Sequence, residues 1–371
     1  MNKRVTFNWL QKATLAMAAI CFIGMVSVTS CNKEGPRSSK HDGATCDIAP
    51  ATEDGTGETA SKGATNQTLT NIYTVADIRT MEGSSSVEVI FSENTQFFTV
   101  ADASTLDFLK EAFSKNEPVA VTFDPWQGVI VKATQPSEQQ SRDIKSRQVV
   151  TSRDHAMRID LSSMSDNDLN NPEDFGVLNT TDPGLNNVIP DFATAQMMFN
   201  YITTQCCAIA GPYTIDHCIT FQYCPDGCYA RAHQMCWIIN NKYKYGTKKI
   251  FSFANASPDK LCVQAQKWGG CCIRWWYHVA PLVTINTPKG PKAYVFDPAM
   301  FNQPVLLSTW LHFQENPACA ASFNPHVTMI NVQPTSSYTP SGSSGYSFST
   351  DPSYSSTNTT LVNYRYLSTC P

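Results

Sequence analysis

The stretch 224–233, which reads CPDGCYARAH, has the residue types of a nucleophilic site. Pro225, Asp226 and Gly227 predict a tight turn, and a helix is expected to begin near Cys228. A cysteine at a helix N-terminus lies near unpaired N–H groups and the positive end of the helix dipole, which both stabilise the nucleophilic thiolate. The same position also suits a structural disulfide, and this stretch alone leaves both interpretations open.

A thiolate nucleophile needs a base, and the base needs a group that orients it. His278 lies in the strand-like run 275–285, 50 residues after Cys228, and Asp297 ends another such run 19 residues later. A short turn between the two strands would place His278 beside Asp297. A single histidine in a strand is more often structural, and an aspartate before proline more often belongs to a turn. Together, in this order, the three residues indicate nucleophilic acyl chemistry.

The N-terminus has the pattern of an export signal. Lys3 and Arg4 precede the apolar run 13–28, and the small residues after it end at Cys31. This pattern is typical of a bacterial lipoprotein, in which Cys31 is lipidated and becomes the new N-terminus. An ordinary cleaved signal and an uncleaved membrane anchor are the alternatives. All three place the remaining chain in an oxidising compartment.

The cysteines gather in the second half of the chain. Of 14 cysteines, Cys21 and Cys31 belong to the signal, Cys46 stands alone, and eleven lie from Cys206 to Cys370. Eleven cysteines form at most five disulfides, so one thiol is left over. We expect that free thiol to be Cys228.

Composition and charge exclude several classes of protein. The chain of 371 residues is 42% hydrophobic and 16% charged, below the typical ~25%, which excludes a coiled coil or a highly charged disordered chain. The net charge of −4 argues against a nucleic-acid partner, and no cofactor is predicted. Residues 32–184 carry 13 Lys and Arg against 24 Asp and Glu, a net charge of −11. Residues 185–371 carry 11 against 7, a net charge of +4, so the two halves attract each other.

These patterns divide the chain into five parts. Residues 1–31 form the lipoprotein-like signal, 32–85 a disordered tether, and 86–134 a small α+β unit without cysteine. Residues 135–184 are a polar, turn-rich and cleavable linker, and 185–371 a compact domain dense in aromatic residues and cysteine.

Periodicity predicts the elements of the small unit. Strands are expected at 86–91 and 95–100, and a helix at 104–115 that Ser104 or Thr105 caps. A hairpin is expected from 119–123 and 129–133.

The stretch from Leu185 to Cys370 resembles the bacterial protein-glutaminases, secreted enzymes that deamidate glutamine side chains in proteins. The matching segments are 188–191 (VIPD), 218–221 (CITF), 226–233 (DGCYARAH), 271–272 (CC), 277–280 (YHVA) and 297–298 (DP). Residues 88–133, with TQFF at 95–98, look like the inhibitory pro-region of that family. Together the resemblance covers about two thirds of the chain.

The resemblance implies a fold and an active site. The fold would be α+β, with a core like that of transglutaminases and more distantly papain-like cysteine hydrolases, after a small α+β pro-domain. Cys228 matches the nucleophile, His278 the general base and acid, and Asp297 the orienting carboxylate. Substrate contacts are expected from Trp275, Trp276 and Tyr229.

The chain also departs from the family pattern. Cys224 and Cys236 are additional cysteines and are expected to form an extra disulfide. A lipoprotein-like Cys31 is not needed by a freely secreted enzyme, so the final location is either the cell envelope or the medium.

The predicted function is that of an exported zymogen. Once an activating protease has removed the pro-domain, the enzyme would hydrolyse exposed glutamines of proteins or peptides to glutamate. The pro-domain would inhibit it by laying a substrate-like plug across the cleft, formed by Asn94, Thr95, Gln96 and Phe97.

Other functions remain open from the residues. A transglutaminase or a cysteine peptidase would use the same three catalytic residues. A protein of another class, a non-catalytic disulfide-rich surface lipoprotein, would have only structural cysteines. A metal site of Cys224, Cys228, His233 and Cys236 is compatible with the spacing but disfavoured in an oxidising compartment, so no metal is predicted.

Overall fold

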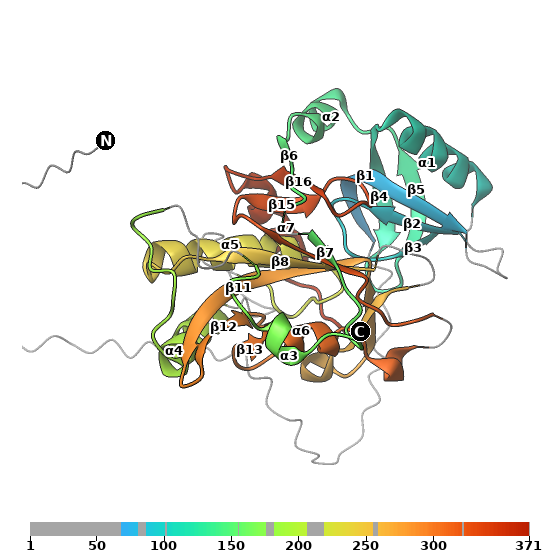
Figure 1. Cartoon of the computed structure of the whole chain (residues 1–371). Helices are drawn as coiled ribbons and strands as arrows, with labels where there is room; N and C mark the ends of the chain where they lie inside the picture. The colour runs from blue at the N-terminus through green and yellow to red at the C-terminus, as the bar shows by residue number, and fades with distance from the viewer. Residues whose placement is uncertain are drawn as a thin grey trace, which may run out of the picture. The chain divides into compact units, whose positions relative to one another are not determined.

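A computed structural model describes residues 68–80, 87–100, 102–154, 156–175, 182–205, 219–254, 259–320 and 323–370 (Figure 1). All of them belong to one compact unit, residues 44–371. The predicted signal, Cys31 and most of the predicted tether lie outside the described residues. None of the helices within these ranges is long and apolar enough to cross a bilayer.

The first part of the described chain is a closed β-barrel with one helix. The strands follow the order β1 (Leu69–Thr80), β2 (Val87–Phe91), β3 (Phe98–Val100), β5 (Val129–Thr134) and β4 (Pro118–Asp124). Phe91, Phe98 and Phe123 fill the barrel, with neighbouring ring centroids 5.1–5.2 Å apart. Helix α1 (Ala103–Lys115) begins one residue earlier than predicted, because the carboxylate of Asp102 accepts the N–H of Thr105 at 2.7 Å.

Strand β1 corrects the predicted domain boundary. The prediction assigned 69–80 to the disordered tether and began the pro-domain at residue 86. In the structure β1 pairs with both β2 and β4 and buries Tyr73 and Val75, so the barrel needs it to close. The sequence around β1 is polar and rich in threonine, so it does not show a clear strand pattern. The strand is stable because it pairs with β2 and β4. The strand predicted at 95–100 is also shorter, since β3 covers Phe98–Val100.

The second part contains an antiparallel sheet of six strands. Their order is β13 (Val305–Leu306), β12 (Gly290–Val295), β11 (Tyr277–Thr287), β8 (Lys248–Phe253), β14 (Met329–Gln333) and β7 (Ala156–Arg158). Helix α5 (Cys228–Lys242) runs beside β11 and β8 (Figure 1). Eleven of its residues are buried, including Arg231, His233 and Gln234, so α5 is surrounded by protein on most sides.

Smaller elements complete this domain. They are α4 (Phe192–Thr203), β9 (Leu261–Gln264), η2 (Gln266–Trp268), β10 (Cys272–Trp275), α6 (Leu307–Phe313), η3 (Pro317–Cys319), β15 (Ser337–Pro340), β16 (Ser347–Thr350) and α7 (Ser355–Tyr364). Strands β9 and β10 form a two-stranded antiparallel sheet that leads directly into β11.

The predicted linker 135–184 is largely structured, which is a second correction. It contains α2 (Glu138–Lys145), β6 (Val149–Thr151), β7 and α3 (Asp166–Leu169). Strand β7 pairs with β14, and β6 pairs with β16, so both extend sheets of the second domain. These strands are three residues long, too short to produce a period in the sequence. The turn at 182–184 is exposed, as a protease site requires.

The cysteine pairing differs from the prediction. Disulfides join Cys271 to Cys370 and Cys272 to Cys319. Four described cysteines are free and buried, namely Cys224, Cys228, Cys236 and Cys262, so the predictions of one leftover thiol and of a Cys224–Cys236 disulfide are wrong. Cys236 lies eight helical residues beyond Cys228, about 12 Å along the axis, while Cys224 precedes the helix. A disulfide requires Cα atoms within about 7 Å of each other.

We expect alkylation of the unfolded, unreduced protein to label the four free thiols. Peptide mass spectrometry should find adducts on Cys224, Cys228, Cys236 and Cys262, because unfolding exposes these thiols. The four cysteines of the two disulfides serve as the internal control and should be labelled only after reduction. If Cys236 is not labelled before reduction, the result would support the predicted extra disulfide.

Candidate active site

Cys228 is the first residue of α5 and follows a left-handed turn. Gly227 has φ 84°, and a Cβ atom there would lie 2.9 Å from the ring of Tyr364, so the turn requires glycine. Arg231 holds the turn from inside the helix, because its Nη1 donates to the carbonyl oxygens of Tyr223 and Asp226, both at 2.9 Å. Sequence reasoning missed this role of Arg231, since an arginine in a helix is usually exposed.

His278 and Asp297 lie side by side. His278 Nε2 donates to Asp297 Oδ2 at 2.8 Å, and Trp310 Nε1 donates to the same oxygen at 3.0 Å. The imidazole stacks on Trp275 at 4.3 Å between ring centroids and on Trp310 at 5.3 Å. Burial alone would raise the pKa of Asp297, but the His278 ring and the Trp310 N–H stabilise the carboxylate and keep that pKa below its usual value.

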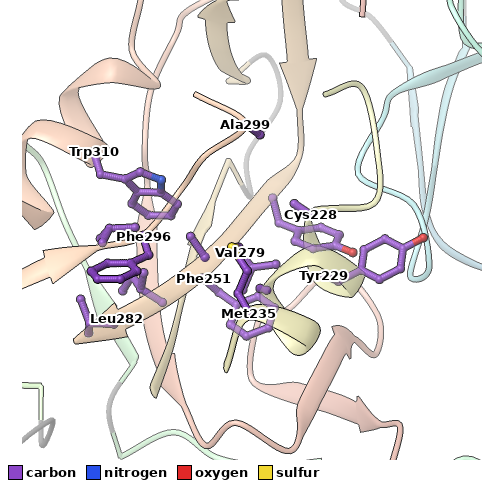
Figure 2. Close-up of a cluster of buried hydrophobic side chains, with 14 of the residues drawn as sticks. Cys228, Tyr229, Met235, Phe251, Val279, Leu282, Phe296, Ala299 and Trp310 are labelled. Carbon is purple, nitrogen blue, oxygen red and sulfur yellow. The ribbon is translucent and has the colours of Figure 1, made fainter. Parts of the chain in front are cut away.

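The second nitrogen of His278 faces the interior without a partner. Because Nε2 donates to Asp297, Nδ1 carries the lone pair, and this buried atom has no hydrogen-bond partner among the described residues. The next residue of β11, Val279, directs its N–H at Cys228. Figure 2 shows Cys228 at the start of α5, with Val279 of β11 beside the helix. The fold therefore brings the thiol to the strand that carries His278.

Burial favours the neutral form of the Cys228 thiol in the uncleaved chain. Burial raises its pKa far above the usual value, and the charge of Arg231 and the Val279 N–H only partly oppose this. Burial has the larger effect, because Cys228 is only 3% exposed. The predicted thiolate, stabilised by the helix N-terminus, belongs to the activated enzyme and stays a prediction.

The segment predicted as a plug lies against the turn before Cys228. Thr95 donates its N–H to Asp226 Oδ1 at 2.9 Å and its hydroxyl to the carbonyl of Pro225 at 2.8 Å. Trp276 donates its backbone N–H to Thr95 O at 3.0 Å and its indole N–H to Asn94 O at 2.7 Å. Three of these four contacts use backbone atoms of the segment, and the fourth uses the Thr95 hydroxyl.

Asp226 is the centre of this contact, although the sequence indicated only a turn residue. Besides Thr95, it accepts the hydroxyl groups of Tyr229 at 3.1 Å and Tyr364 at 2.6 Å. Burial raises the pKa of Asp226, and these donors act in the opposite direction.

The other predicted substrate and plug residues are placed as follows. Trp275 donates its indole N–H to the carbonyl of Cys224 at 3.0 Å and so braces the turn as well as stacking on His278. Gln96 turns back to the barrel, where Nε2 donates to Pro125 O at 2.9 Å. Phe97 lies with its ring 4.1 Å from the ammonium of Lys260.

The residues of the alternative metal site are not grouped as ligands. His233 Nδ1 accepts from Lys249 Nζ at 2.7 Å and Nε2 contacts the carbonyl of Asp351 at 3.2 Å, so both ring nitrogens have partners. Within the described part of the chain, no three His, Cys, Asp or Glu side chains are grouped as metal ligands.

Comparisons with known proteins agree on one family. A family model described as glutaminase matches residues 195–314, which contain Cys228, His278 and Asp297. No curated protein matches the chain.

Solved structures extend the match to the barrel. The crystal structure of pro-protein-glutaminase is 26% identical, with a TM-score of 0.56, covering 81% of this chain and 93% of that one. A mutant of pro-protein-glutaminase gives 25% identity, a TM-score of 0.57 and the same coverage. The NMR structure of protein-glutaminase from Chryseobacterium proteolyticum is 33% identical, with a TM-score of 0.42, and covers 49% of this chain and 91% of that one.

The predicted α+β class and the resemblance are thus confirmed. Because the pro-form matches across both the barrel and the larger domain, the chain belongs to the protein-glutaminase family and is a homologue of its zymogen.

Proposed function

We propose that the chain is the precursor of an enzyme that deamidates protein-bound glutamine to glutamate and ammonia. The observation that carries the proposal is the arrangement of Cys228, His278 and Asp297 in one buried site. His278 is held through Nε2 by Asp297 and keeps Nδ1 unpartnered. This is the arrangement that a base needs when it serves a thiol nucleophile.

The reaction proceeds through a thioester. The Cys228 thiol gives its proton to His278 Nδ1, and the thiolate attacks the side-chain carboxamide carbon of glutamine. His278 returns the proton to the departing nitrogen, which leaves as ammonia. Water then gives a proton to Nδ1 and attacks the thioester carbon, and the carbon–sulfur bond breaks to release glutamate and regenerate the thiol. The N–H of Cys228, at the start of α5, is positioned to stabilise the oxyanion.

The test is the product formed from a glutamine peptide and from a casein-type protein by the proteolytically activated chain. We expect release of ammonia and a mass gain of about one dalton per glutamine, by simple atom arithmetic on the –NH₂ to –OH exchange. Crosslinked products would identify a transglutaminase instead, and shorter fragments a cysteine peptidase. No change of either substrate would favour the non-catalytic lipoprotein.

We also propose that the precursor is exported and carries a lipid on Cys31. Support comes from the sequence pattern at residues 1–31 and from the two disulfides. Fatty-acid labelling in a bacterial host should mark the wild-type chain and not the Cys31→Ala variant. Equal labelling of both would overturn the lipid anchor.

A further inference from the structure

A buried lysine lies where the barrel meets the larger domain. Lys260 belongs to the larger domain, because its N–H donates to Asn324 O and its carbonyl accepts from His326 N, both at 3.1 Å. Its side chain forms an ion pair with Glu88 of barrel strand β2. Lys260 is only 3% exposed and Glu88 8%, so the barrel supplies a buried counter-charge to a cation of the enzyme.

The surroundings of Lys260 are cationic and aromatic. Its ammonium lies 4.1 Å from the ring centroid of Phe97 in the barrel and 5.6 Å from that of Phe323 in the larger domain. The guanidinium of Arg274 lies over the same Phe323 ring at 4.8 Å. Burial lowers the pKa of Lys260, and Glu88 opposes this by stabilising the charged form. These surroundings therefore favour an anion.

Lys260 is also adjacent to the group that binds the plug. Lys260 directly precedes Leu261, which pairs with Trp275, the neighbour of Trp276, at the end of the β9–β10 ladder. Trp276 binds the carbonyl oxygens of Asn94 and Thr95. Phe97, two residues after Thr95 and beyond a bend at Gln96, is the residue that reaches Lys260.

Removal of the pro-domain takes Glu88 and Phe97 away and leaves Lys260 beside Arg274 and Phe323. Lys260 has then lost its carboxylate partner and lies beside a second cation, so a substrate that brings a carboxylate to this place gains an ion pair. Building on the proposed function, we infer that Lys260 forms an acid-binding subsite. A substrate that follows the path of the plug, with its glutamine at the place of Thr95, would bring the second residue after the glutamine to Lys260, and glutamate or aspartate would be selected there.

The test compares three capped pentapeptides, Gly-Gln-Gly-X-Gly, with X as Glu, Ser or Lys. With activated wild-type enzyme freed of the pro-domain, we expect kcat/KM about 10-fold higher for Glu than for Ser, and lowest for Lys. The preference should shrink in 0.5 M NaCl because salt screens the partly exposed pair. Lys260→Glu should reverse the order of the Glu and Lys peptides. The matched control Lys289→Glu, exposed in the turn between β11 and β12, should keep it.

The possible results distinguish a failure of the Lys260 subsite from a failure of the proposed deamidase activity. Equal kcat/KM for the three peptides, or an unchanged order in Lys260→Glu, overturns the subsite and leaves the deamidase standing. Ammonia release from none of them overturns the deamidase. In that case calorimetry measures peptide binding to the activated Cys228→Ser variant. The subsite requires that the Glu peptide bind more tightly than the Ser peptide. Should Lys260→Glu not fold, Lys260→Arg must retain the Glu preference, and its loss there overturns the inference.

Discussion

Replacing Cys228 with serine in the activated protein should lower kcat for ammonia release by at least about 10³-fold. The serine hydroxyl fits the space of the thiol, but it ionises far less readily and is the poorer nucleophile. Cys228 lies in a packed interior at 3% exposure, so this nearly isosteric change should leave the thermal midpoint within a few degrees. Ammonia release and thermal unfolding of the same preparation are the two measurements.

The matched control is Cys236→Ser, a second buried free cysteine on the same helix. Because Cys236 lies two turns beyond the nucleophile, its replacement should keep kcat within about 3-fold. Comparable activity of Cys228→Ser and wild type would remove Cys228 as the nucleophile.

Replacement of His278 and replacement of Asp297 should lower kcat to different extents. His278→Ala should reduce kcat more than Asp297→Ala, because the imidazole transfers the proton while the carboxylate only orients it. Trp310 also donates to Asp297 and stacks on His278, so part of the orientation survives the loss of the carboxylate. A larger loss in Asp297→Ala would reverse these roles.

The residues of this site could be predicted because each of them lies in a short sequence motif. A cysteine after a Pro-Asp-Gly turn, a histidine in a strand and an aspartate at the end of the next strand need only a hairpin to meet. The β11–β12 hairpin supplies it, with Leu282 opposite Val295. The burial of the thiol could not be predicted, because segments distant in the sequence produce it.

Other features depend on long-range contacts that leave little local pattern. Strand β1 closes the barrel across a polar stretch, and β7 adds to β14 over a separation of about 170 residues. Asp226 looked like a turn residue, because its partner Thr95 is 131 positions away. The free Cys236 was predicted to be paired, since counting cysteines says nothing about which of them lie within bonding distance.

The structure supports a specific form of latency. The barrel lays Thr95 against Asp226 and Trp276, at the turn that leads into Cys228, and burial raises the pKa of the thiol. The covalent connection gives the plug a high effective concentration, so even weak docking blocks the site. A cut at the exposed 182–184 turn ends this connection. The linker strands β6 and β7 still hold the N-terminal part to the larger domain, so the cut alone should leave much of the complex intact.

Activation should therefore occur in two steps. We expect the intact chain to show below about 1% of the final kcat/KM on a small glutamine peptide, since a tethered segment acts at millimolar effective concentration. The nicked chain should gain activity on dilution, because its plug now binds as a separate molecule, and separated enzyme should reach the full value. Peptide assays of intact, nicked and separated protein at several concentrations measure this. Equal activity in all three would mean that the pro-domain only assists folding.

A pair of variants in the intact chain tests the plug without a protease. Glu88→Gln removes the counter-charge of Lys260 and should raise the basal activity several-fold, because loss of one partner of a buried ion pair weakens docking of the barrel. Glu111→Gln, exposed on α1 and paired only within that helix in the described structure, is the matched control and should leave basal activity unchanged. Both variants lose one negative charge, so a rise in both would trace latency to overall charge attraction between the two halves. A rise in Glu88→Gln alone would trace it to the contact at Lys260, and no rise in either would remove that contact from the mechanism of inhibition.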